Sequence, residues 1–223
     1  MKIGLVSFGL FALVMVAPFS VWAMACPVAP RPNVSIQVLD PAASIKTHKS
    51  LKQINASATG QGLVHKGSRA LGTTQSEVEA SMNMNFIGQK QIRGQQHIFC
   101  LNTKFVKARF GHSKLIVNLP REYRRGSCQY NVVHRHEMAH VDVNRQGVRK
   151  YAAILKSELE RELQRIGTLQ VKTMARGTQI FEKRLKAVVE AVTNRFNSEI
   201  KGFHGRIDAP GSPYAADGAC KSW

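Results

Sequence analysis

The chain has 223 residues, with 32 Lys or Arg and 14 Asp or Glu, and a formal net charge of +18. Its length fits one domain of ordinary size with a buried core. The basic excess favours anionic partners such as cell-envelope polymers, although it also suits a surface charged only for solubility. The chain lacks a zinc finger, an aromatic platform and a basic arm, which argues against nucleic-acid binding.

The first 25 residues resemble a secretory signal peptide. Lys2 precedes the apolar stretch Ile3–Val21, Pro18 interrupts it near its end, and small residues lie just before Cys26. We therefore expect cleavage after residue 25 and export to the periplasm or the medium, with no integral membrane segment left. Loss of Lys2 lowers the net charge to +17. A retained membrane anchor and a lipoprotein acylated at Cys26 are the alternatives.

The first half of the mature chain predicts β-structure. Val34–Val38 and Val78–Phe86 alternate apolar and polar residues, which is typical of strands with one buried face. A polar loop is expected over Gly88–Gln96. His97–Phe110 and Ser113–Leu119 then read as two strands joined in a hairpin at Gly111 and His112. These elements predict a small, mostly antiparallel sheet.

The second half predicts helices, because no proline occurs between Pro120 and Pro210 and the apolar period changes to about 3.6 residues. One helix should begin near Tyr130 and end or bend at Gly147. Two further apolar stripes cover 148–166 and 181–200, the second ending before Gly202. The expected fold class is α+β, with the sheet followed by a motif helix and long C-terminal helices. Residues 26–205 would form the domain and 206–223 a loop tail.

The motif helix carries His136-Glu137-Met138-Ala139-His140. Residues four apart share a helix face, so His136 and His140 are expected to bind one metal ion, for which zinc is the candidate. Glu137 would act as general base towards a zinc-activated water. This arrangement predicts a hydrolase that cleaves peptide bonds in a peptide or protein substrate.

A catalytic zinc needs a third protein ligand. Proteases with a further His six residues after the second are excluded, because Gln146 occupies that position and Val143 replaces the Gly of that pattern. The main candidate is His204, beside Gly205. Glu199 is an alternative, either as ligand or as partner of a ligating His, and so is the acidic group Glu158, Glu160 and Glu162.

The four cysteines, Cys26, Cys100, Cys128 and Cys220, all follow the predicted cleavage site. An even number in an exported chain indicates two disulfides, for which three pairings exist. The preferred pairing joins Cys100 to Cys128 and Cys26 to Cys220.

With its signal peptide, short β region, His-Glu-Met-Ala-His-Val motif and long following helix, the chain resembles the bacterial predicted secreted zinc-dependent proteases grouped as DUF922. The resemblance covers roughly Asn33–Gly205, and Glu199 with the pair His204-Gly205 is similar to the family's acidic residue and His-Gly pair. It implies a zincin-like fold and a secreted zinc metallopeptidase. The alternative is a cationic envelope-binding protein with a structural or vestigial zinc site. A hydrolase of cell-wall peptide cross-links would differ from the leading hypothesis only in substrate.

Overall fold

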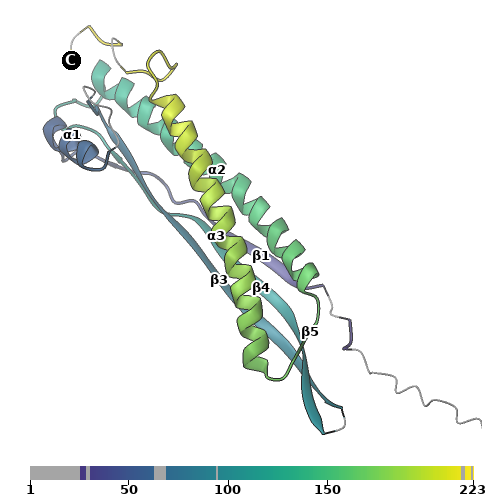
Figure 1. Cartoon of the computed structure of the whole chain (residues 1–223). Helices are drawn as coiled ribbons and strands as arrows, with labels where there is room; N and C mark the ends of the chain where they lie inside the picture. The colour runs from purple at the N-terminus through teal and green to yellow at the C-terminus, as the bar shows by residue number, and fades with distance from the viewer. Residues whose placement is uncertain (1–25, 29–30, 63–68, 94, 217–218, 222) are drawn as a thin grey trace, which may run out of the picture.

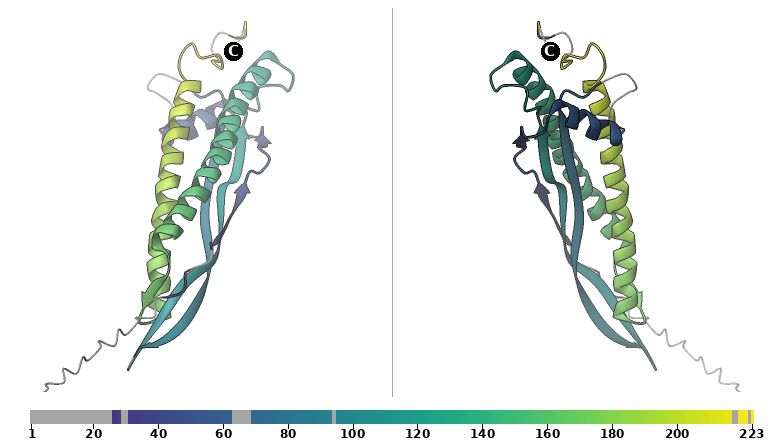
Figure 2. Two further views of the ribbon diagram at one scale, coloured as in Figure 1. Left: turned by 90° about the vertical axis from the view of Figure 1, so that its right-hand side faces the viewer. Right: turned by 90° about the vertical axis from the view of Figure 1, so that its left-hand side faces the viewer.

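The structure is a computed structural model that describes residues 26–28, 31–62, 69–93, 95–216, 219–221 and 223 (Figure 1). The predicted signal peptide lies outside these residues. The described chain is a mixed α and β protein in which one sheet is covered by two long helices (Figures 1 and 2). This arrangement is compatible with the predicted α+β class.

The sheet is organised around β4, Gln96–Asn118, which pairs with every other strand. The long strand β3, Thr73–Arg93, runs antiparallel to β4, and so does the short strand β5, Leu169–Val171. By contrast, β1, Asn33–Leu39, and β2, Ser44–Lys46, run parallel to β4. The prediction of a mostly antiparallel sheet is therefore corrected to a mixed sheet, in which two of the four strands paired with β4 are parallel to it.

Two predictions about the strands are wrong. The polar segment expected as a loop over Gly88–Gln96 belongs to the hairpin of β3 and β4, in which Arg93 pairs with Gln96. The expected hairpin at Gly111 and His112 is instead the interior of β4. Gly111 has a φ of 143°, and a Cβ there would lie 2.2 Å from the carbonyl oxygen of Leu39 on β1. This glycine therefore marks an irregularity in one continuous strand, next to a register shift between Glu77 and Val78.

The two long helices are α2, Cys128–Ile166, and α3, Met174–Ile207, which lie side by side on one face of the sheet (Figure 2). The Ser127 side chain caps α2 by accepting a hydrogen bond from the Tyr130 backbone N–H, at 3.2 Å. The core between sheet and helices is apolar and includes Val106, Phe110, Val148, Leu155, Phe181 and Phe196. A shorter helix, α1, Leu51–Gly60, lies near the end of the sheet where α2 begins (Figure 1).

Both long helices exceed their predicted limits. The helix α2 continues through Gly147 without interruption. A Cβ at this position would lie 2.3 Å from Cδ1 of Ile200 on α3. The glycine therefore allows α3 to approach α2 closely. At its other end α3 continues through His204 to Ile207, so the predicted end before Gly202 is wrong. As a result, Asp208 is the first residue after the helix.

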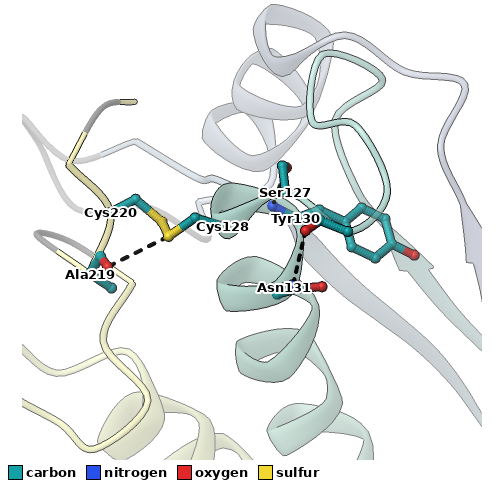
Figure 3. The surroundings of a disulfide bond; sticks show 7 residues. Ser127, Cys128, Tyr130, Asn131, Ala219 and Cys220 are labelled. Atoms are coloured by element: carbon teal, nitrogen blue, oxygen red, sulfur yellow. Dashed lines mark hydrogen bonds between the residues drawn. A yellow bond between two sulfur atoms is a disulfide. The ribbon is translucent and has the colours of Figure 1, made fainter.

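The preferred disulfide pairing is also wrong. Cys26 is bonded to Cys100 on β4, and Cys128 at the start of α2 is bonded to Cys220 in the tail (Figure 3). Because the sulfur of Cys26 is in a disulfide, it does not carry the lipid of a lipoprotein. Two disulfides fit an exported protein. Among the residues described, no helix has both the length and the apolar character to cross a membrane.

Candidate metal centre

The candidate site lies where the first third of α2 meets the end of α3 and the tail. His136 and His140 are one turn apart on α2, as the motif predicts, and their Nε2 atoms are 3.2 Å apart. Asp208 follows directly after the last residue of α3 and brings its carboxylate to the same point.

Three ligand atoms from these residues form a nearly equilateral triangle. Oδ1 of Asp208 is 3.2 Å from Nε2 of His136 and 3.0 Å from Nε2 of His140. Zinc bound at roughly 2.0–2.1 Å in tetrahedral geometry separates neighbouring ligand atoms by about 3.3 Å. His136, His140 and Asp208 would therefore supply three of the four ligands of such an ion. The donor set of two imidazoles and one carboxylate thus fits a zinc ion of the catalytic type.

Hydrogen bonds on the other ring nitrogens orient both histidines. Nδ1 of His136 donates to the carbonyl oxygen of Tyr214, at 2.9 Å, so Nε2 is the nitrogen that would bind a metal in the neutral ring. Nδ1 of His140 lies 2.7 Å from Nδ1 of His204. If His140 binds metal through Nε2, its Nδ1 carries the proton and His204 accepts the hydrogen bond.

The charges and hydrogen bonds of the site favour the ionised form of the Asp208 carboxyl. Burial opposes ionisation of Asp208, but hydrogen bonds from His136 and His140 hold the pKa of its carboxyl well below the usual range. Burial acts against the charged form of His136, yet its hydrogen bond to Asp208 gives a net rise in its pKa. Burial, reinforced by the neighbouring His140, lowers the pKa of His204 to about 4. His204 is therefore neutral at pH 7, as an acceptor for His140 must be.

Glu137 faces the sheet. Its side chain is buried, and Oε2 accepts a hydrogen bond of 2.7 Å from the hydroxyl of Thr74 at the start of β3. Burial raises the pKa of its carboxyl. Gly72 covers it so closely that a Cβ at that position would lie 2.7 Å from Oε1. The predicted general base is thus held by the strand that flanks the motif helix.

The other predicted ligand candidates lie elsewhere. His204 is on the last turn of α3, where it contacts the ring nitrogen of His140 that faces away from the triangle. Glu199 accepts hydrogen bonds from Lys150 and Tyr151. The acidic group on α2 forms ion pairs with basic residues, Glu158 with Arg161, Glu160 with Lys156, and Glu162 with Arg165 and Arg184.

Asp208 was absent from the sequence-based candidates because the tail was expected to begin at Arg206 as a loop. It lies four residues after His204, and its backbone N–H donates to the carbonyl oxygen of His204. A helix extended by one turn would have placed both side chains near the same end of α3. That spacing was the available signal.

No family model, curated protein or solved structure matches the chain. The resemblance to the secreted zinc-dependent proteases therefore stays a prediction, and the functional argument depends on the geometry of the site.

Proposed function

We propose that this protein is an exported zinc metallopeptidase in which His136, His140 and Asp208 hold the ion and Glu137 is the general base. The observation that carries the proposal is the triangle of ligand atoms, with edges of 3.0–3.2 Å, whose two ring nitrogens are oriented by hydrogen bonds on the opposite side of each ring. His204, which was predicted to be a ligand, is in this proposal a hydrogen-bond partner of His140.

A bound zinc ion would supply Lewis acidity towards a carbonyl group and towards water. The contribution of the chain is to fix three ligands and to place a carboxylate next to the first of them. Glu137 would accept a proton from the attacking water and donate it to the leaving amine. Burial supports this role, because a carboxyl with a raised pKa is a stronger base and is more readily kept protonated for the second step.

The fold is consistent with a zincin-like peptidase at the level of a motif helix flanked by a β-sheet. The motif, the helix and the two disulfides also fit the resemblance to secreted DUF922 proteases. These features support a hydrolase of peptide bonds, and peptide cross-links of the cell wall are one substrate that would also suit a cationic protein.

The second candidate is a cationic envelope-binding protein with a structural zinc site. The observation in its favour is that Glu137 is only 3% exposed and already hydrogen-bonded to Thr74. A carboxyl used only to join α2 to β3 would have the same surroundings.

Hydrolysis of a fluorescently labelled unfolded protein by residues 26–223, produced with both disulfides formed, separates the two candidates. We expect activity that a chelator abolishes and one equivalent of zinc restores. Glu137→Gln should keep its zinc but lose activity by about 10²–10⁴-fold, the usual contribution of a general acid–base group. Glu160→Gln, a matched change on the exposed face of α2, should be fully active.

Two results would reject the peptidase. One is an inactive wild-type protein that is fully loaded with zinc. The other is a Glu137→Gln variant as active as the wild type. Either would leave the envelope-binding protein as the better candidate.

A further inference from the structure

A cleft of ≈ 680 Å³ opens beside the candidate metal centre, between α2, the end of α3 and the tail. Its lining residues are sequence neighbours of the ligands: Ala139 precedes His140 and Ile207 precedes Asp208. Tyr214 also lines it and accepts the hydrogen bond from His136. A substrate bound at the metal would therefore have this cleft at its side.

The cleft lies on the flank of α2 opposite Glu137. Met138, Ala139 and Asp142 contribute to it, whereas Glu137 faces Thr74 on the sheet side. Successive residues on a helix turn by about 100°, so the ligands stand between these two flanks. A peptide bond held between the metal and Glu137 would direct an adjoining part of the substrate towards the cleft.

One wall of the cleft is apolar and partly exposed. It includes Phe203 and Tyr214, whose exposed fractions are 37% and 43%, together with Val143 and Met138. Large aromatic side chains left exposed next to a concave site commonly mark a place where an apolar group binds. The size of the cleft suits an aromatic or large aliphatic side chain together with a neighbouring backbone segment.

The polar groups of the cleft favour an anion. Arg135 and Arg206 both line it, and neither lies within ion-pair distance of a carboxylate in the part of the chain that the structure describes. The guanidinium of Arg206 stacks over the ring of Phe203 at 4.1 Å, which fixes its position beside the apolar wall. One carboxylate, that of Asp142, also lines the cleft, so the two guanidiniums leave a net positive charge.

We infer that this cleft is the specificity pocket of the proposed peptidase, and that it binds a peptide segment in which a carboxylate adjoins an aromatic or large aliphatic side chain. Guanidinium groups recognise carboxylates through paired hydrogen bonds, and the apolar wall would cover the adjoining side chain. The inference rests on the proposed function insofar as it takes peptides to be the ligands.

Binding without turnover tests the cleft separately from the reaction. The zinc-loaded Glu137→Gln protein would be titrated with two fluorescein-labelled decapeptides by fluorescence anisotropy. Both peptides carry a central Phe, flanked by Asp in one and by Asn in the other. We expect the Asp peptide to bind about 10-fold more tightly, as for a charge-assisted hydrogen bond. Arg135→Gln and Arg206→Gln should each remove most of this preference.

Arg176→Gln is the matched control, because it removes one exposed positive charge at the other end of α3. Two results would overturn the inference: equal binding of the two peptides, or an Arg176→Gln variant that weakens binding as much as the cleft variants. The second result would mean that peptides bind through the overall positive charge of the protein and not through the cleft. If the wild type fails to cleave a peptide that the cleft selects, the peptidase fails and the cleft stands. If it cleaves both peptides equally well, the cleft fails and the peptidase stands.

Discussion

Replacing Gly72 by Ala should displace the proposed general base without touching the metal ligands. The added Cβ would lie 2.7 Å from Oε1 of Glu137 and 2.7 Å from Cγ1 of Val133. Ordinary contacts need about 3.5 Å or more, so the carboxyl must move by roughly 1 Å. That movement also disturbs the 2.7 Å hydrogen bond from Thr74. Overpacking of this kind costs about 1–3 kcal/mol of unfolding free energy.

The catalytic effect should be larger than the effect on stability. A misplacement of about 1 Å at a reacting group lowers the rate by roughly 10²-fold. The free energy lost should lower Tm by about 2–4 °C per kcal/mol in a chain of this size. Zinc content is expected to equal that of the wild type, because the three atoms nearest to the new methyl group belong to Glu137 and Val133 and not to a ligand.

Calorimetry and the labelled-protein assay measure the two effects. Gly202→Ala is the matched control: it lies within α3 with nothing within 4 Å of its Cβ position, and should stabilise the protein by about 0.5–1 kcal/mol with unchanged activity. A Gly72→Ala variant with the stability and activity of the wild type would refute the reasoning, since the covering of Glu137 would then have no functional consequence.

Three further predictions concern the surroundings of the site. His204→Ala should still bind one zinc ion but about 10–100-fold more weakly in a competition titration with a chromophoric chelator, whereas complete loss would identify His204 as a ligand. Burial lowers the pKa of His112, so between that lowered pKa and about pH 6.5 the unfolded chain binds more protons than the native protein, and stability decreases as the pH is lowered through this range. Urea unfolding should show a smaller decrease for His112→Gln, and an identical dependence on pH would contradict this. Replacing Cys128 and Cys220 by Ser should cost about 2–4 kcal/mol and also weaken zinc binding, because the tail carries the carbonyl that orients the first ligand. The same change in the other disulfide should cost similar stability with zinc affinity unaltered, and equal losses of affinity would show that the tail has no special role.

The features predictable from the sequence are those with a local cause. The motif lies on a helix, and Val78–Phe86 lies in β3, because periods of 3.6 and 2 residues are set by which face is buried. No such alternation is present over 88–93, where β3 continues as part of a hairpin that extends beyond the helices (Figure 1). Strand residues that lack a covering layer on one face need not alternate.

The features that escaped prediction depend on contacts between distant segments. Gly111 permits close approach of β4 to Leu39, which cannot be inferred before β1 is placed beside β4. The disulfide of Cys26 with Cys100 likewise depends on where the N-terminal segment meets β4. Asp208 became a candidate ligand only because α3 continues to Ile207, beyond the end that its apolar stripe predicted.

The zinc content of the mature protein, measured by mass spectrometry, tests the proposed site most directly. We expect one zinc ion per chain in the wild type and in Glu137→Gln, and loss of the ion in His136→Ala and Asp208→Ala. A wild-type protein that binds no zinc when zinc is supplied would contradict the metal centre. Retention of the ion by Asp208→Ala at wild-type affinity would contradict the assignment of Asp208 as the third ligand.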